Sequence, residues 1–305
     1  PHLLFPDPKK GAHDFKFVGF RYRLMNYALP ETCDTVFEMV SGLIERLKLR
    51  YIHWECDQAP LPTWQAVDPT GKIQFAFYEG LYSVWERLLE RHPDVFIQNN
   101  LVGAHRLDLG VIRRSHGGWA NELSGDPHRC RRMQLSGNTF LPASHLGTIL
   151  APKPLKGHIG MDEEISDLSC ISRMAGMLFV SARMEEIEAA PLANLKHWIG
   201  VFKRFRHLLM KDYYHLTAQP QDEADWDAGQ FCDGRKEGIV LVFRFYGTTE
   251  RQEIGMRSLD PESQYRVTNE KSGEAKEYSG KDLMAKGLPV ELEANDARYF
   301  SYRAM

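Results

Sequence analysis

Short apolar runs alternate with longer amphipathic runs from about residue 20 to residue 210, and this alternation limits the fold more than any other feature. The runs typical of strands are residues 21–28, 51–54, 94–100, 117–122 and 177–183. Between them, runs such as residues 30–47 and 81–92 place apolar residues at helical spacing. Strands that alternate with helices pair in parallel through right-handed crossovers. The sequence therefore predicts an α/β fold for residues 1–211.

The character of the chain changes after residue 212. An acidic, proline-containing bridge leads into three strand-like runs, at residues 238–247, 264–270 and 297–304. Gly, Pro, Asp and Asn turns separate these runs, and only residues 281–286 favour a helix. We therefore predict a small antiparallel β-domain over residues 212–305.

Composition excludes some classes of function. The chain has 305 residues, 43% hydrophobic and 26% charged, with a formal net charge of −3. A phosphate-binding surface usually shows a basic excess, so we expect no nucleic-acid partner. No apolar run reaches the roughly 18 residues that span a bilayer, so we expect no membrane segment. The five cysteines are widely spaced, which favours a reducing cytoplasm over disulfides or a zinc site; a secreted or periplasmic location stays open.

Polar side chains gather where three of the predicted strands end. His53 and Glu55 stand at the end of the run 51–54, residues 98–100 end the run 94–100, and Trp119 and Glu122 belong to the run 117–122. In parallel α/β folds, ligands bind at the carboxyl ends of the strands. Aromatic faces stack on sugar rings, amides bond hydroxyl groups, and paired carboxylates cleave glycosidic bonds. The strand ends therefore predict a carbohydrate site that contains Glu55 and Glu122.

Two of these strand ends resemble motifs of the melibiase family of α-galactosidases, glycoside hydrolase family 36 of clan D. In that family a strand ending in Lys-Trp-Asp carries the nucleophile. The stretch IHWECD is similar, with Glu55 at the nucleophile position and His53 at the substrate-binding lysine. The next family motif is a Cys- and Gly-rich turn followed by Arg-x-Asp. The stretch QNNLVGAHRLD keeps Arg106 and Asp108, with Asn100 in place of the cysteine.

A third motif and the C-terminal region extend the resemblance from about residue 20 to the end of the chain. WANELSGDPHR is similar to the family's Trp-x-Ser-Asp motif, with Glu122 at the acid/base position and Arg129 at the helix arginine. The region that begins LDPESQYRV is similar to the β-sandwich that follows the family's barrel. The resemblance implies that residues 1–211 are the C-terminal part of a (β/α)8 TIM-type barrel. Residues 212–305 would then form a small antiparallel β-sandwich.

The resemblance implies a retaining double displacement on an α-linked sugar, without a metal or an organic cofactor. Glu55 would be the nucleophile and Glu122 the acid/base. Together with the strand-end argument, it gives the candidate substrate-binding residues His53, Trp54, Asp57, Asn99, Asn100, Arg106, Trp119 and Asn121. Some alternatives stay open. Asp57 could be a turn residue, a hydroxyl acceptor or the nucleophile itself, Trp54 could pack the barrel, and Arg106 could pair with Asp108.

Both catalytic positions hold Glu where the family has Asp, and this departure leaves three functions open. The first is an α-galactosidase-like hydrolase of a carbohydrate substrate. The second is a sugar-binding subunit that does not hydrolyse its ligand. The third is a transglycosylase, or a hydrolase for a different sugar, because the Cys and Gly signature that shapes the galactose pocket is replaced.

In the family the nucleophile strand is the fourth of the barrel, so the resemblance implies that the first strands and the family's large N-terminal β-sandwich are not part of this chain. An open barrel would leave strand edges and core side chains exposed. We therefore expect that a second polypeptide, or an N-terminal segment missing from this chain, completes the barrel. An oligomer is the expected state.

Overall fold

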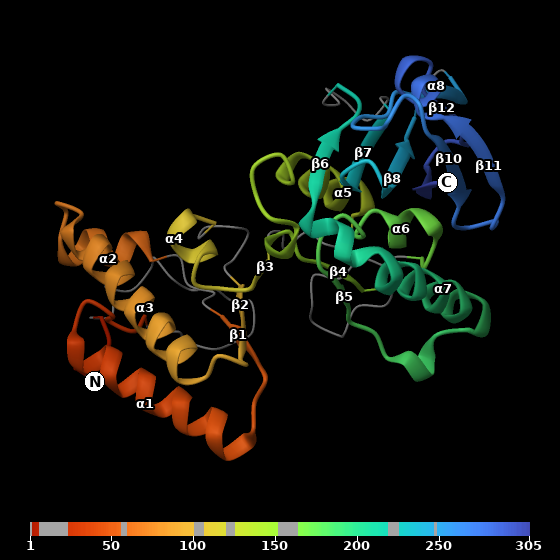
Figure 1. Cartoon of the computed structure of the whole chain (residues 1–305). Coiled ribbons are helices and arrows are strands. Elements are labelled where there is room, and N and C mark those ends of the chain that lie inside the picture. Colours follow the sequence, from red (N-terminus) through yellow and green to blue (C-terminus); the bar gives the residue numbers. More distant parts are fainter. Residues whose placement is uncertain are drawn as a thin grey trace. The chain divides into compact units, whose positions relative to one another are not determined.

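The computed structural model describes residues 2–5, 24–55, 60–100, 107–119, 126–151, 164–218, 226–246 and 249–305. They fall into two compact units, Pro1–Glu122 and Leu123–Met305. Figure 1 shows the helices and strands of both units. Among the described helices, none is both long enough and apolar enough to cross a membrane.

The first unit is built on a three-stranded parallel sheet. Its strands are β1 (Tyr51–Trp54), β2 (Phe96–Asn100) and β3 (Gly117–Trp119), hydrogen-bonded in that order. Its helices are α1 (Pro30–Leu47), α2 (Leu61–Val67), α3 (Lys72–Arg91) and α4 (Leu109–Ile112). Helices that alternate with parallel strands confirm the predicted α/β fold of this region.

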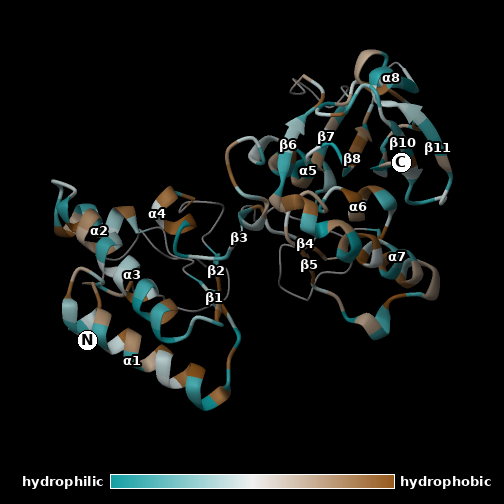
Figure 2. Cartoon of the chain, viewed as in Figure 1, coloured by the Kyte–Doolittle hydropathy of each residue, from teal (hydrophilic) through white to brown (hydrophobic). Residues whose placement is uncertain are grey.

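Local chemistry fixes both ends of α1. Pro30 suits the first turn because its ring presets φ and its missing N–H has no helical partner there. Lys48 ends the helix in the left-handed conformation, with φ of 53°, and its N–H bonds the carbonyl of Ile44. Hydrophilic and hydrophobic residues alternate along α1 and α3 (Figure 2), so each helix buries one side.

Helix α3 lies at the centre of the core of the first unit. Leu81 and Trp85 are fully buried, and they belong to the same cluster as Ile97 of β2. Gly80 lets α3 approach the preceding chain closely, because a Cβ atom there would lie 1.9 Å from the carbonyl oxygen of Tyr27. This packing fixes the helices against the sheet that carries the candidate site.

The strand predicted over residues 21–28 is wrong from residue 24 on, where the structure describes it. Met25 makes a single bridge to Leu4. A turn follows at once, closed by a hydrogen bond from the Leu29 N–H to the Asn26 carbonyl at 3.0 Å. The chain therefore turns into α1 instead of extending along a sheet.

The second unit combines a short parallel sheet with a six-stranded antiparallel sheet. The parallel pair is β4 (Thr148–Leu150) and β5 (Leu178–Val180). The antiparallel sheet, in the order β11-β10-β13-β8-β7-β6, consists of β6 (Asp212–His215), β7 (Asp227–Asp233), β8 (Glu237–Arg244), β10 (Gln264–Asn269), β11 (Ala275–Ser279) and β13 (Asp296–Ala304). A separate ribbon pairs β9 (Arg251–Ile254) with β12 (Leu288–Glu291).

Four α-helices and three short 3₁₀ helices complete the second unit. They are α5 (Pro127–Gly137), α6 (Asp167–Ile171), α7 (Ala189–Phe205), α8 (Gly280–Ala285), and the 3₁₀ helices Ala143–His145, Met184–Glu186 and Arg206–Met210, all within the described residues. Helix α8 confirms the helix predicted near residues 281–286.

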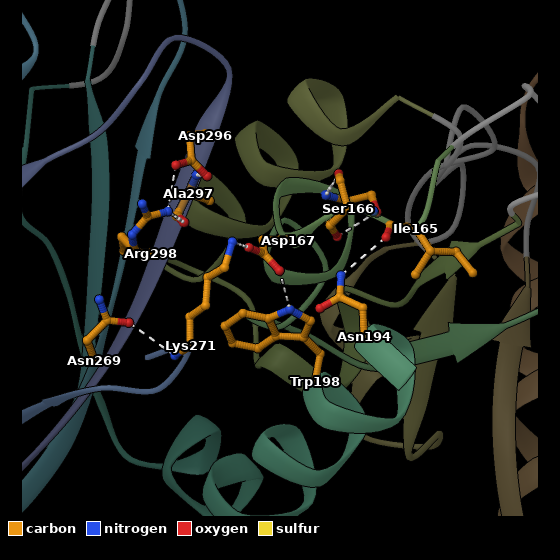
Figure 3. Close-up of polar contacts among 11 residues, drawn as sticks. Ile165, Ser166, Asp167, Asn194, Trp198, Asn269, Lys271, Asp296, Ala297 and Arg298 are labelled. Carbon is orange, nitrogen blue, oxygen red and sulfur yellow. Dashed lines mark hydrogen bonds and ion pairs between the residues drawn. The ribbon is translucent and has the colours of Figure 1, made fainter. Parts of the chain in front are cut away.

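The predicted domain boundary between residues 211 and 212 falls inside the second unit. One hydrophobic cluster contains residues from both sides of it, including Trp198 of α7 with Leu241 and Tyr299 of the antiparallel sheet. Asp167 of α6 accepts a hydrogen bond from the Trp198 indole at 2.9 Å and pairs with Lys271 from the sheet side (Figure 3). These contacts join residues on both sides of residue 211. The division into residues 1–211 and 212–305 stays a prediction.

Candidate active site

Strand alternation gives β1 a polar face and an apolar face. Tyr51 and His53 share one face with Glu55, the residue directly after the strand, because side chains point the same way at every second residue. The parallel register pairs His53 with Gln98 of β2. Asn100, two residues further on, therefore lies beside Glu55.

A continuous hydrogen-bond network crosses this polar face. His53 Nδ1 lies 2.7 Å from Gln98 Oε1, and His53 Nε2 lies 2.7 Å from Glu55 Oε2. Asn100 Nδ2 donates to both oxygens of the Glu55 carboxylate, at 2.8 Å and 2.7 Å. The Tyr51 hydroxyl donates to Gln98 Oε1. Because donors reach both carboxylate oxygens, the network fixes the orientation of Glu55.

The network is buried at its base and open at Glu55. Gln98 is 1% exposed and Asn100 is 8% exposed, whereas the Glu55 side chain is 40% exposed. Partial desolvation raises the pKa of Tyr51, which is 45% exposed, and this keeps its hydroxyl protonated as a donor. A carboxylate that is held from below and reachable from outside can attack an electrophilic carbon or accept hydrogen bonds from sugar hydroxyls.

Trp54 and Asn99 lie on the opposite face of the sheet, where the register pairs them with each other. Trp54 packs edge to face on Trp85 of α3, with ring centroids 5.7 Å apart. Asn99 is 2% exposed. The packing alternative for Trp54 therefore fits the structure. Neither side chain belongs to the polar face with Glu55, so their predicted contact with substrate has no support from the geometry.

Trp119, the last residue of β3, pairs in register with Asn100. The two side chains are therefore cross-strand neighbours on the polar face of the sheet. Asp108 has a different role. It caps α4 by accepting from the Val111 N–H at 2.9 Å, and it accepts from the Tyr82 hydroxyl at 2.7 Å. Asp108 therefore caps α4 and links its start to α3.

Four of the predicted site residues lie outside the described residues: Glu122, Asp57, Arg106 and Asn121. Their roles stay predictions. The same holds for the distance between the two catalytic carboxylates, which separates retaining from inverting enzymes. Arg129 near the start of α5 is described, and its Nε lies 3.2 Å from Asp126 Oδ2.

The sequence reasoning missed Tyr51, which belongs to the network through Gln98. A signal for it was present, because Tyr51 stands two residues before His53 in a strand and so shares its face. Among the residues that the structure describes, no three His, Cys, Asp or Glu side chains are grouped so that they could hold a metal ion.

The comparisons with known proteins agree with this combination of an α/β region and an antiparallel β region. The galactosidase domain of an alpha-galactosidase-sucrose kinase superposes on 100% of this chain and 41% of its own, with a TM-score of 0.80 and 21% identity. An alpha-galactosidase from Lactobacillus brevis gives a TM-score of 0.81 at 18% identity, over 99% of this chain and 41% of its own. At these identities the likeness shows the fold.

Residues 13–212 match the melibiase family. The chain belongs to this family. Its relatives include the bifunctional alpha-galactosidase/sucrose kinase of Mediterraneibacter gnavus, 22% identical over 92% of this chain and 29% of that protein. A probable alpha-galactosidase C of Aspergillus terreus is 26% identical over 89% of this chain and 35% of that protein. The chain thus spans about a third of the length of these curated relatives.

Proposed function

We propose that this chain carries the nucleophile of a retaining glycoside hydrolase that cleaves α-linked galactosides. Membership of the melibiase family and relatives that are named alpha-galactosidases support the proposal. The observation that carries it is the position of Glu55 at the carboxyl end of β1, held by His53 and Asn100. This is the end of the strands at which α/β enzymes present their catalytic groups.

In the proposed reaction, Glu55 and Glu122 carry out a double displacement. A carboxylate oxygen of Glu55 attacks the anomeric carbon while the Glu122 carboxylic acid gives its proton to the departing glycosidic oxygen. The glycosidic bond breaks and a galactosyl ester of Glu55 forms. The Glu122 carboxylate then takes a proton from water, whose oxygen attacks the same carbon and releases Glu55. Two inversions at one carbon leave the anomeric configuration unchanged.

His53 has a positioning and electrostatic role in this proposal. Gln98 Oε1 and Glu55 Oε2, at 2.7 Å from its two ring nitrogens, are both acceptors. A protonated imidazole satisfies both acceptors at once. His53 would then place a positive charge where the family's substrate-binding lysine places one.

We also propose that strands from outside this chain complete a (β/α)8 barrel. The described parallel strands are three in one sheet and two in another, and β1 stands at the edge of its sheet. An eight-stranded barrel needs three further strands, and the first to be added would pair with β1. Native mass spectrometry tests this part of the proposal. A homo-oligomer or a bound second polypeptide supports it, and a monomer that hydrolyses galactosides contradicts it.

Hydrolysis of 4-nitrophenyl α-galactoside by the complete assembly tests the function. Glu55→Ala should lower kcat by at least about a thousandfold, because the covalent step loses its nucleophile. Azide should restore turnover of this variant by attacking the anomeric carbon from the vacated side, which yields the β-galactosyl azide. Glu45→Ala is the matched control, since Glu45 is an exposed residue of α1 that pairs with Arg91 at 3.1 Å.

Glu45→Ala should keep the wild-type rate. Proton NMR of the first sugar released assigns the stereochemistry, and an α-anomer agrees with two displacements. A Glu55→Ala rate close to wild type, or a β-anomer as the first product, removes Glu55 from the nucleophile role. Galactoside binding without any turnover in the wild-type assembly would favour the sugar-binding subunit instead.

A further inference from the structure

A groove lies in the second unit between one face of β11-β10-β13 and the β9–β12 ribbon. Its volume is about 430 Å³, within the range of roughly 300–1,000 Å³ that is usual for small-ligand sites. None of the candidate active-site residues lines it. The lining residues lie between Arg251 and Phe300.

The register of the antiparallel sheet brings two aromatic rings onto the groove side. Val267 pairs with Lys276, and Asn269 pairs with Phe300. Tyr278, two residues after Lys276, shares their face because side chains alternate along a strand. Tyr278 and Phe300 are half-buried and Val267 is buried. The groove therefore has an apolar floor with two ring surfaces that a ligand can touch.

The charges around the groove cancel. Its lining contains three cations, Arg251, Lys276 and Arg298, and three anions, Glu253, Glu274 and Glu291. Each cation already has a carboxylate partner at 2.6 to 3.0 Å: Lys276 with Glu274, Arg251 with Glu291, and Arg298 with Asp296 (the last is drawn in Figure 3). A phosphate or a nucleic acid would therefore find no excess of positive charge to bind, whereas a neutral ligand does not need one.

Two polar groups of the groove remain available for hydrogen bonds. Glu253 is exposed and has no ion-pair partner among the residues that the structure describes. Asn269 uses its side-chain oxygen to accept from the Lys271 N–H at 3.0 Å, which leaves its amide hydrogens to donate. An acceptor and a donor beside two aromatic rings match a sugar, which offers hydroxyl groups at its rim and C–H groups on its faces.

We propose that this groove binds a neutral oligosaccharide, with a pyranose face on Tyr278 and Phe300 and hydroxyls on Glu253 and Asn269. The choice of a galactoside as ligand rests on the proposed function. The inference that the groove binds a neutral sugar rests only on the residues that line it. Such a site would hold an oligomeric substrate on the β region between rounds of hydrolysis.

Titration of the ¹⁵N-labelled protein with raffinose, a neutral galactose-containing trisaccharide, tests the proposal. Backbone amide shifts locate the bound sugar independently of any hydrolysis. We expect saturable shifts at Asn269, Lys276, Tyr278 and Phe300, complete by roughly 20 mM if Kd is about 1 mM. Inorganic phosphate should leave these amides unmoved. Absence of shifts there with raffinose, or shifts with phosphate alone, would overturn the proposal.

Variants separate a sugar site from a merely polar surface. Tyr278→Ala should weaken raffinose binding roughly 3- to 10-fold, as expected for one lost aromatic contact, and Tyr278→Phe should keep it. Glu253→Ala is the second variant, since its side chain is exposed and its loss leaves the core intact. Glu277→Ala is the matched control, because Glu277 faces away from the groove and pairs with Arg266. If Tyr278→Ala and Glu253→Ala both bind raffinose with the affinity of the wild type, the proposal is refuted even if galactoside hydrolysis is intact.

Discussion

Replacement of Asp227 by asparagine should destabilise the second unit strongly. Asp227 is 1% exposed, and it pairs with Arg131 of α5, whose side chain is fully buried. Asp227 also lies 2.6 Å from the His215 Nε2 atom. Burial lowers the pKa of Arg131, and the charge of Asp227 opposes that shift. The substitution therefore leaves a buried cation without its counter-charge.

The size of the effect follows from this burial. Removal of one partner of a buried ion pair costs about 3–5 kcal/mol. A unit of this size loses roughly 2–4 °C in Tm per kcal/mol, so we expect a fall of roughly 6–20 °C. The Arg131 guanidinium lies 4.0 Å from the centre of the Phe245 ring. That contact is worth up to about 2 kcal/mol, which does not replace a carboxylate.

Hydrogen exchange of the β7 and β8 amides measures the free energy of unfolding of the second unit alone. Glu277→Gln is the control, because the exposed pair between Glu277 and Arg266 should contribute less than about 1 kcal/mol. Arg131→Met added to Asp227→Asn should recover part of the loss, since no buried cation remains. A cost below about 1 kcal/mol for Asp227→Asn would refute the reasoning, because a buried, paired carboxylate cannot be lost so cheaply.

Three further substitutions test close packing in the first unit and a buried carboxylate in the second. Gly80→Ala should destabilise the first unit by about 1–3 kcal/mol, because the new methyl would meet the Tyr27 carbonyl oxygen at 1.9 Å. In Gly42→Ala, a change in α1, the new methyl has no atom within 4 Å, so this variant should stabilise the first unit by about 0.5–1 kcal/mol. Hydrogen exchange of the α3 amides in urea compares the stability of the two variants. In the second unit, burial alone would raise the pKa of Asp167, but hydrogen bonds from Lys271 and Trp198 outweigh it and lower that pKa. The stabilisation is therefore present above the ordinary Asp pKa, and it is lost as the pH falls through the lowered value. Asp167→Asn should lower Tm at pH 7 but make much less difference near about pH 2–3, as thermal unfolding at both values would show.

The sequence predicted α1, the strands of the first sheet and β5, β8, β10 and β13, but not α2, β6, β7, β9, β11 or β12, and not the contacts within the second unit. The period of apolar residues predicted α1 over residues 30–47 and the parallel strands. The domain boundary could not be read in the same way. The break in composition at residue 212 is real, yet the apolar side of α7 packs on the antiparallel sheet through Trp198 and Tyr299. Composition along the chain does not record which later element covers an earlier one.

Register explains which part of the candidate site could be predicted. The strand-end rule placed His53, Glu55 and Asn100 together, and the structure places them in one network. The rule could not choose between Asn99 and Asn100, because neighbouring residues of a strand point to opposite faces. Only the pairing of β1 with β2 decides that Asn100 faces Glu55.

Two predicted departures from the family's motifs concern side chains that touch in the structure. The resemblance implies that Glu55 takes the position of a shorter Asp and that Asn100 takes the position of a Cys. A longer side chain has one more rotatable bond and is harder to hold in one orientation. The Asn100 amide reaches both oxygens of Glu55, at 2.8 Å and 2.7 Å, and an amide is a stronger hydrogen-bond donor than a thiol. We infer that the Asn100 amide supplies the constraint that the longer acid needs.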